Sequence, residues 1–301
     1  MMRVAMNLPP YCLLTLVGVM FMGSPILARS LCATEPTYTS LAPDRAHWQR
    51  VKVHSPWQSA PTLLRIRAPK SDKPLPVIYV LPVEAEEDKQ WGDPLQAVDV
   101  CDPTLLQRAI FVAPTFAQLP WYADHPSDPG VQQEKHFLKA VMPYITGHFS
   151  TKDQPLLLGF SKSGWGAWSV LLRHPDRFAR AVAWDAPLMT MDLKRYGMRP
   201  IFGSLENLRS YQITELIKRR AQNEISRGMK RLALFGNSNF LAEHEAAHAL
   251  LTDLALPHAF ALGPKRKHHW QTGWLESAVC FLLDGSPKRP KRQQGPLKDP
   301  R

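Results

Sequence analysis

One stretch constrains the fold more than any other: the segment from Pro155 to Ala167, where an apolar run ends abruptly in small residues around Ser161. The run Leu156 to Leu158 shows no alternation, which is typical of a central parallel strand that is covered on both faces. Apolar residues then recur at helical spacing, at Trp165, Trp168, Leu171 and Leu172. The pattern predicts a buried strand that turns sharply into a helix, with Ser161 at the turn.

Such a turn is typical of a nucleophile elbow. An elbow needs small neighbours, because the strand and the following helix approach closely and the nucleophile has strained backbone geometry. Here Gly159 precedes Ser161 by two residues, and Ser163 stands where Gly-x-Ser-x-Gly has its second glycine. Serine is small enough for that position. The alternative interpretation is a Gly/Ser-rich turn without chemistry.

Strand and helix patterns alternate along most of the chain, which predicts an α/β fold with a mostly parallel sheet and helices on both faces. An antiparallel hairpin at the sheet edge is expected first, from Gln49 to His54 and from Thr62 to Arg67. The later strands are expected at 77–81, 109–113, 156–158, 179–184, 231–235 and 258–262. Helices are expected before 102, at 131–149, after Ser161, at 242–254 and at 272–283, and Pro143 should kink or divide the second of these. We therefore expect one domain over 45–284, with an insertion at 189–229 that contains loops and at least one helix, at 213–226.

The two ends of the chain differ from this domain. Arg3, an apolar run and small residues up to Ala28 follow the order of a secretory signal peptide, so we expect export, with cleavage after Ala28 or as late as Ala33. An uncleaved anchor is the alternative, and cleavage would leave no membrane span. Of the formal charge of +11, a net of +5 (six Lys and Arg minus one Asp) lies at the other end, where 285–301 is expected to be a basic, proline-rich, disordered tail. The body lacks a basic stripe with interleaved aromatics, which argues against nucleic-acid binding.

Several blocks of the chain resemble the α/β-hydrolase superfamily, in particular the esterase branch that includes esterase D, feruloyl and carbohydrate esterases and the mycolyltransferases. The resemblance spans Val51 to Leu283. The blocks that carry it are the strand Pro76 to Leu81, Trp121-Tyr-Ala-Asp124, the helix Gln133 to Pro143, Gly159 to Ala167, Arg173 to Phe178, and Lys267-His-His-Trp270. It implies an α/β-hydrolase fold and a serine nucleophile that is followed along the chain by an acid and then by a histidine.

The resemblance points to His268 as the catalytic base, because Trp270 completes a His-x-Trp pattern after the last strand; His269 is the alternative. The family's acid position holds Asn239 in this chain. An asparagine cannot stabilise an imidazolium electrostatically, so another carboxylate is needed. Asp185, just after the strand that follows the elbow helix, is the first choice, with Glu243 and Glu245 as the others. A structural role in the following turn is the competing interpretation of Asp185.

The oxyanion hole should use the backbone N–H of Lys162 and one N–H from the loop after Leu81. The family often has His-Gly in that loop, whereas this chain has Pro82, which lacks an N–H, so the second donor would be Val83 or Glu84.

The loop 114–129 follows a parallel strand at the edge of the sheet where such folds bind ligands, and it carries Trp121 and Tyr122. We expect these two aromatics to contact substrate. The alternative is that they pack the loop against the domain.

These features predict an exported serine hydrolase, secreted or periplasmic, that cleaves a small-molecule or polysaccharide-linked ester through an acyl-enzyme. Acyl transfer to an alcohol is a variant of the same chemistry. The rival hypothesis is a non-catalytic member of the fold that binds a carbohydrate or envelope component. No clustered Cys/His ligands and no dinucleotide or phosphate loop appear in the sequence, so neither a metal nor an organic cofactor is expected.

Overall fold

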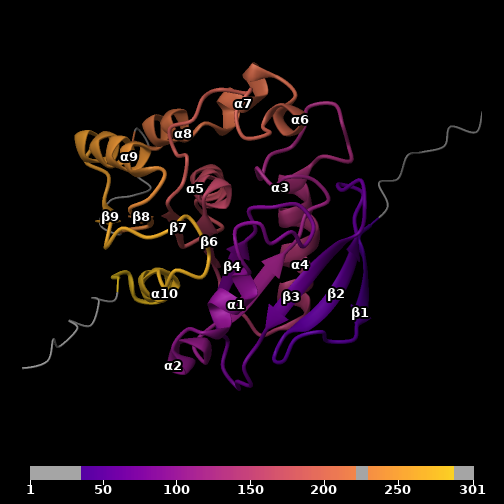
Figure 1. Ribbon diagram of the computed structural model, residues 1–301. Helices are drawn as coiled ribbons and strands as arrows, with labels where there is room; N and C mark the ends of the chain where they lie inside the picture. Colours follow the sequence, from indigo (N-terminus) through magenta and orange to yellow (C-terminus); the bar gives the residue numbers. More distant parts are fainter. Residues whose placement is uncertain (1–34, 222–229, 288–301) are drawn as a thin grey trace, which may run out of the picture. The chain divides into compact units, whose positions relative to one another are not determined.

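A single sheet runs through the computed structural model, which describes residues 35–221 and 230–287. These residues belong to one compact unit, Thr34–Arg301. Within them the strand order is β1-β2-β3-β5-β4-β6-β7-β8-β9 (Figure 1). The strands are β1 (Thr37–Leu41), β2 (Gln49–His54), β3 (Thr62–Arg67), β4 (Val77–Leu81), β5 (Ile110–Pro114), β6 (Leu156–Phe160), β7 (Arg180–Trp184), β8 (Leu232–Phe235) and β9 (His258–Ala261). All pairs from β5 to β9 are parallel, whereas β1, β2 and β3 pair antiparallel, which confirms the predicted fold class.

Strand β1 is an addition to the predicted sheet. It pairs with β2 from Thr37 opposite His54 to Leu41 opposite Arg50, and it lies before residue 45, where we expected the domain to begin. Three of its five residues are exposed and the other two are half-buried. A short, polar edge strand of this kind has no clear alternation of apolar residues, and therefore it gave no signal in the sequence.

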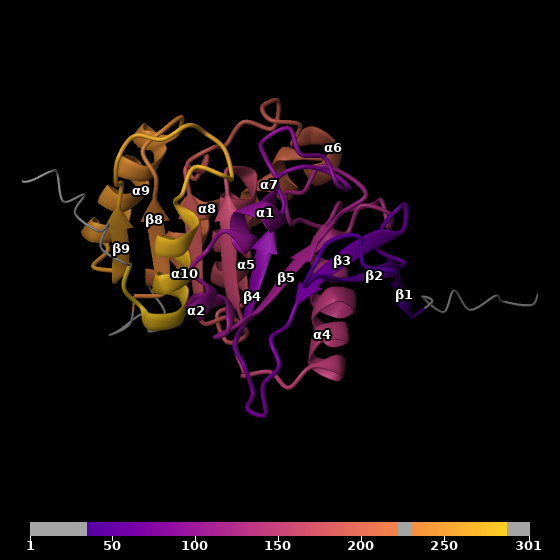
Figure 2. The same ribbon diagram turned by 60° about the horizontal axis from the view of Figure 1, so that its bottom comes forward.

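Helices cover both faces of the sheet, and the side chains of each central strand alternate between two cores. In β4, Tyr79 and Leu81 belong to one core, and Ile78 and Val80 to the other. The first core is closed by α3 (Gln133–His136), the π-helical segment η1 (Phe137–Val141), α4 (Met142–His148), α5 (Lys162–Arg173) and the later helices up to α9 (Leu241–Asp253). The second is closed by α1 (Pro94–Asp99), α2 (Pro103–Leu106) and α10 (Leu275–Asp284), which come to the front in Figure 2. None of the helices in the described ranges is both long enough and apolar enough to span a membrane.

The helix expected at 131–149 runs without a break from Gln133 to His148, but a π-helical segment interrupts its α-helical geometry before Pro143. Pro143 lies in the first turn of α4, directly after the π-helical segment η1. Proline has no N–H to donate to the preceding turn and its ring crowds that turn, so the backbone widens there. The rest of the α3–α4 region stays buried against the sheet through Phe137, Val141 and Ile145.

The insertion after β7 contains three helices in its described part, where at least one was expected. Its described part forms α6 (Arg199–Phe202), α7 (Leu205–Tyr211) and α8 (Ile213–Ala221). The remainder of the insertion, 222–229, lies outside the described residues, as do the predicted signal peptide and residues 288–301 of the predicted tail.

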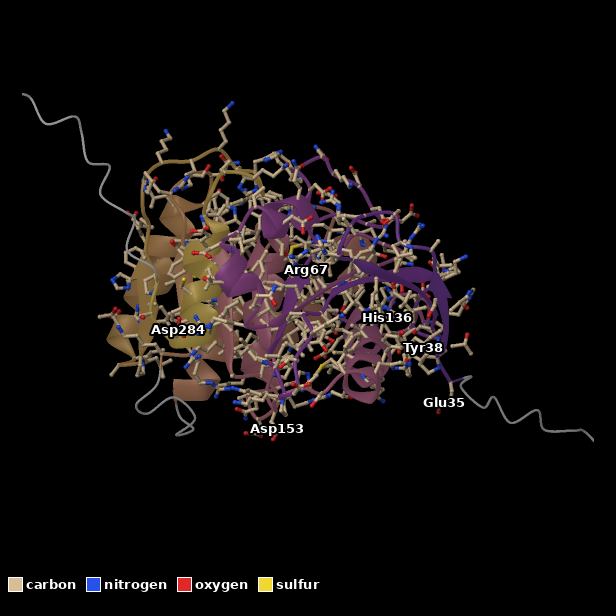
Figure 3. The ribbon with its side chains drawn as sticks, turned by 90° about the horizontal axis from the view of Figure 1, so that it is seen from below. Glu35, Tyr38, Arg67, His136, Asp153 and Asp284 are labelled. Carbon is tan, nitrogen blue, oxygen red and sulfur yellow. The ribbon has the colours of Figure 1, made fainter. Side chains whose placement is uncertain are left out.

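Two fully buried histidines should make the protein sensitive to mild acid. His136, labelled in Figure 3, and His244 are both 0% exposed, and burial lowers their pKa from 6.5 to about 3 and about 4. The folded chain therefore keeps them neutral while the unfolded chain takes up protons, so stability is lost as the pH falls below about 6.5. Between pH 7 and pH 5 we expect the free energy of unfolding to fall by roughly 2 kcal/mol per histidine. Urea titrations at the two pH values would measure this loss, and His136→Gln should make it smaller; an equal loss in that variant would contradict the prediction.

Candidate active site

Ser161 lies at the sharp turn between β6 and α5. Its backbone has φ 52° and ψ −127°, a conformation that non-glycine residues rarely adopt and that surrounding structure must enforce. A hydrogen bond from the Ser161 N–H to the Trp184 carbonyl (3.0 Å) ties the turn to the neighbouring strand β7. The turn raises the Ser161 side chain above the carboxyl edge of the sheet, where it is 7% exposed.

The small residues around Ser161 are required by this turn. A Cβ on Gly159 would lie 2.1 Å from the backbone oxygen of Ser163, so only glycine fits. Ser163 itself is buried, and its hydroxyl accepts from the Phe160 N–H and donates to the Phe160 carbonyl, both at 2.9 Å. The serine that replaces the second glycine of the motif therefore braces the end of the strand.

His268 and Asp185 form a buried pair. The His268 Nδ1 lies 2.5 Å from the Asp185 Oδ2, although 83 residues separate them. Asp185 also accepts from the backbone N–H groups of Phe240 (2.8 Å) and Asn239 (3.0 Å). Burial by itself would raise the pKa of Asp185, but the bonds from His268, Phe240 and Asn239 hold that pKa below its ordinary value. The carboxylate stays ionised and the imidazole is oriented by it.

The other candidates for acid and base lie elsewhere. Glu243 accepts from the Met189 N–H at 2.9 Å, and Glu245 is exposed. Asn239 contributes its backbone N–H to Asp185. The ring of His269 packs against Gly92, and its Nδ1 accepts from the Gln271 N–H. Among the described residues, Asp185 is thus the candidate acid whose side chain contacts His268. Glu243, Glu245 and Asn239 make no such side-chain contact with His268, and His269 makes none with Asp185.

Ser161 and His268 line the same cavity, whose volume is about 350 Å³. No hydrogen bond joins the Ser161 hydroxyl to His268 in the part of the chain that the structure describes. Catalytic contacts of this kind are often long before substrate binds and tighten in the complex. The His268 ring is held by aromatic neighbours, with ring centroids 4.4 Å from Phe160, 5.2 Å from Trp91 and 5.5 Å from Phe240.

Two backbone segments could stabilise an oxyanion beside Ser161. One is the start of α5 at Lys162; the other is the loop after β4, at Pro82, Val83 and Glu84. Neither the Lys162 nor the Val83 N–H donates to a protein acceptor within residues 35–221 and 230–287. An ion pair between the Lys162 Nζ and the Glu84 Oε1 (3.0 Å) connects the two segments.

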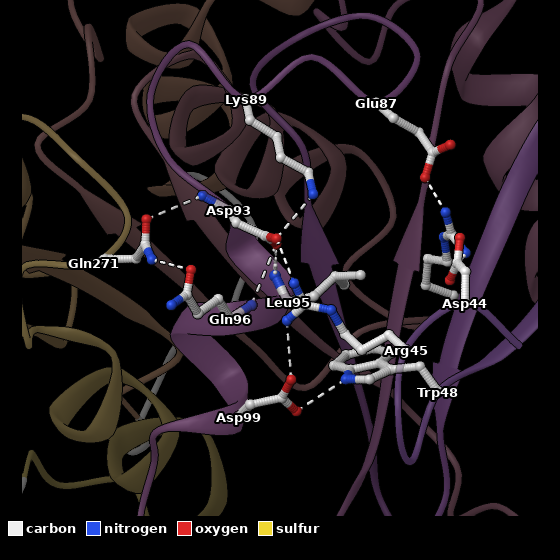
Figure 4. A network of polar contacts seen from close by, with 11 residues as sticks. Asp44, Arg45, Trp48, Glu87, Lys89, Asp93, Leu95, Gln96, Asp99 and Gln271 are labelled. Carbon is white, nitrogen blue, oxygen red and sulfur yellow. Dashed lines mark hydrogen bonds and ion pairs between the residues drawn. The ribbon is translucent and has the colours of Figure 1, made fainter.

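The far end of the same loop is anchored by a network of charges (Figure 4). Asp93 caps α1 by accepting from the Leu95 and Gln96 N–H groups, and it also pairs with Arg45 (2.6 Å) and Lys89 (2.9 Å). Negative charge at the N-terminus of a helix is favourable, so the cap and the ion pairs reinforce one another. The loop that carries the second oxyanion segment is therefore held at both ends.

The expected substrate contact of Trp121 and Tyr122 is not supported, and the alternative, that they pack the loop against the domain, matches the structure. Both are 0% exposed and neither lines the cavity at Ser161. The Trp121 indole donates to the Tyr196 carbonyl (3.1 Å), and the Tyr122 hydroxyl donates to the Pro82 carbonyl (2.6 Å). Loop 114–129 folds its aromatics into the core because α5 and the insertion cover them, which local sequence does not reveal.

Other side chains form the walls of the cavity. Trp91, Leu119, Pro187, Tyr196 and Phe240 supply apolar surface, and Gln90 and Asn239 add polar groups. None of these apolar residues was predicted from the sequence to line the site. Trp91 and Leu119 lie in loops after parallel strands, a position that favours ligand contact, whereas Tyr196 sits in the insertion without any recognisable signal.

A mostly parallel sheet with a strained serine at its carboxyl edge, and an Asp–His pair supplied by later loops, defines an α/β-hydrolase. The family model described as "Putative esterase" matches residues 62–272, most of the described sheet and all of these site residues. The chain belongs to this esterase family, and the protein is accordingly an enzyme of the serine-esterase class.

Solved structures agree on the fold at low sequence identity. S-formylglutathione hydrolase from Staphylococcus aureus shares 15% identity at a TM-score of 0.61, over 83% of this chain and 100% of that one. A ferulic acid esterase shares 18% sequence identity at a TM-score of 0.60, over 83% of this chain and 97% of that one. MPT51 from Mycobacterium tuberculosis shares 17% sequence identity at a TM-score of 0.61, over 81% of this chain and 100% of that one. Among curated proteins, no match was found.

Proposed function

We propose that the protein is an exported hydrolase that cleaves an ester through a covalent intermediate on Ser161. The observation that carries the proposal is the 2.5 Å contact of His268 with the buried Asp185, beside a serine in elbow geometry. A nucleophilic serine needs a base that is itself oriented by a third group. Asp185 orients His268 in this way, Ser161 lines the same cavity as His268, and the three residues follow the chain order of the class.

In the proposed reaction the Ser161 oxygen attacks the ester carbonyl while the His268 Nε2 takes the hydroxyl proton. Asp185 stabilises the resulting imidazolium. The N–H groups of Lys162 and Val83 bind the tetrahedral oxyanion. His268 then gives its proton to the leaving alcohol, and a water attacks the acyl-enzyme by the same steps to release the acid.

The cavity favours an ester with an apolar or ring-bearing group. Its walls are largely aromatic and aliphatic, and the cation Lys162 is already paired with Glu84. Small-molecule esters and esters on a polysaccharide both fit this description, and an alcohol in place of water would convert hydrolysis into acyl transfer. The non-catalytic alternative depended on Trp121 and Tyr122 as an exposed binding surface, and both side chains are buried.

Export is part of the proposal and rests on the order of charged, apolar and small residues in 1–28. N-terminal sequencing of protein recovered from the periplasm or medium should begin after Ala28 or Ala33. Recovery of only the full-length chain from the cell interior would contradict export.

Fluorophosphonate labelling tests the chemistry. The folded protein should incorporate one label per chain, and mass spectrometry of the labelled peptides should place that label on Ser161. Hydrolysis of acyl esters of graded length, and of acetylated and feruloylated sugars, would then define the substrate. A folded wild-type protein that takes up no label would contradict the proposed function.

A further inference from the structure

Tyr122 occupies an unusual position behind the site. It is fully buried with φ 56°, and its hydroxyl donates to the Pro82 carbonyl at 2.6 Å, across 40 residues of sequence. Burial raises the pKa of Tyr122 well above its usual value, and a hydrogen bond with Ser163 offsets this only in part. The phenol therefore stays protonated and remains a donor throughout the working range of pH.

The bond to Pro82 controls the direction of a neighbouring N–H. A peptide unit is planar and, when trans, its carbonyl and the following N–H point in opposite directions. The described residues contain no cis peptide bond. Holding the Pro82 carbonyl toward Tyr122 thus points the Val83 N–H away from Tyr122. Pro82 has no N–H of its own, so Val83 carries the first donor of the loop.

Tyr122 is itself held firmly. Its backbone N–H donates to the Gln133 Oε1 at 2.9 Å, and its carbonyl accepts from Arg173 at 3.2 Å. Its ring lies against Gly166 in α5, where a Cβ would come within 2.0 Å of the Tyr122 Cδ2. One rigid side chain therefore contacts both the helix that begins at Lys162 and the loop that carries Val83.

We propose that Tyr122 is a positioning residue of the oxyanion hole: its hydroxyl fixes the Pro82–Val83 peptide so that the Val83 N–H faces the oxyanion formed at Ser161. The proposal rests on the proposed function. It replaces the expected substrate contact of Tyr122 with a role through the backbone. It also explains how the Val83 N–H could act as the second oxyanion donor, although this loop lacks the His-Gly pattern that the resemblance to the family led us to expect.

Tyr122→Phe tests the proposal because it removes one oxygen and leaves the ring against Gly166. Loss of an oxyanion donor costs about 10²–10³ in kcat, so a misdirected donor should lower kcat about tenfold to a hundredfold. KM should stay within about twofold, because the ground-state ester makes little use of the hole. The affinity for a trifluoromethyl ketone, which forms a hemiketal oxyanion on the serine, should fall by the same factor as kcat/KM.

Tyr38→Phe is the matched control. The Tyr38 hydroxyl also donates to a backbone carbonyl, that of Ala140, at 2.9 Å, but on the first strand of the sheet. This variant should retain the wild-type kcat and the wild-type affinity for the ketone. Thermal unfolding of Tyr122→Phe and Tyr38→Phe would measure how much stability each protein loses with its hydrogen bond.

A double-mutant cycle separates positioning from general damage. Val83→Pro removes the donor itself, so adding Tyr122→Phe to it should cause little further loss of kcat, whereas independent effects would multiply. Wild-type kcat in folded Tyr122→Phe, or full multiplication in the double variant, would overturn the proposal. Should Tyr122→Phe not fold, unchanged kcat in Val83→Pro would overturn it equally. Failure of the wild type to take up fluorophosphonate would instead refute the proposed function.

Discussion

Replacing Ser161 with alanine is expected to lower kcat for ester hydrolysis about 10⁶-fold, the scale found when a triad serine is removed from a serine protease. The variant loses the oxygen that is proposed to form the covalent intermediate, while the hydrogen bond from the Ser161 N–H to the Trp184 carbonyl, which holds the turn, involves only backbone groups and is kept. Residual turnover should come from binding and oxyanion stabilisation alone. Steady-state kinetics on the best ester of the panel, with single-turnover assays for the slow variant, would measure the loss.

Ser169→Ala is the control for this prediction. Ser169 is also buried in α5, and its hydroxyl donates to the Tyr211 carbonyl at 3.2 Å, away from the cavity. Its removal should leave kcat close to that of the wild type. A Ser161→Ala protein that is folded and within tenfold of wild-type kcat would show that another group is the nucleophile.

Asp185→Asn is expected to lower kcat about 10⁴-fold, as the corresponding exchange does in a serine protease. Asparagine is nearly isosteric, but its single carbonyl oxygen can accept from only one of the two N–H groups, since Asn239 and Phe240 donate to different oxygens of Asp185. It also carries no charge to stabilise the imidazolium and permits the wrong tautomer of His268. KM should change little. The measurement is kcat at a pH where the wild-type rate no longer varies.

Glu243→Gln tests one of the two alternative acids, Glu243 and Glu245. Burial raises the pKa of Glu243, and its Oε2 accepts from the Met189 N–H. This variant should retain most of the wild-type kcat. A large loss in Glu243→Gln together with near-normal Asp185→Asn would reverse the assignment of the acid.

The proposed position of the acid has a physical explanation in the sheet. Strands β7 and β8 are parallel neighbours, with Trp184 opposite Phe235, so the positions just beyond their carboxyl ends lie side by side. A carboxylate after β7 can therefore reach the same histidine as the carboxylate after β8 that the resemblance to the family implied. The Asn239 N–H then donates to the carboxylate of Asp185.

The sequence was a good guide where a local pattern has a direct physical meaning. Continuous apolar runs predicted β4 and β6, and the Gly159-x-Ser161-x-Ser163 turn predicted the elbow between β6 and α5. It was a poor guide for β1, whose five residues are mostly exposed, and for Trp121 and Tyr122, which looked exposed because they lie in a loop. Burial of a loop depends on which helix covers it, and that information is spread along the chain.

By itself the sequence determined the class of fold and the strained serine, because these follow from periodicity and turn chemistry within short segments. The expected order of serine, acid and histidine came from the resemblance to the α/β-hydrolase superfamily. Only the tertiary structure decided that Asp185 contacts His268, 83 residues away, and that the buried Tyr122 hydroxyl donates a hydrogen bond to the Pro82 carbonyl. Contacts between distant segments are set by how the strands of the sheet are ordered and how its helices pack. A local pattern carries neither.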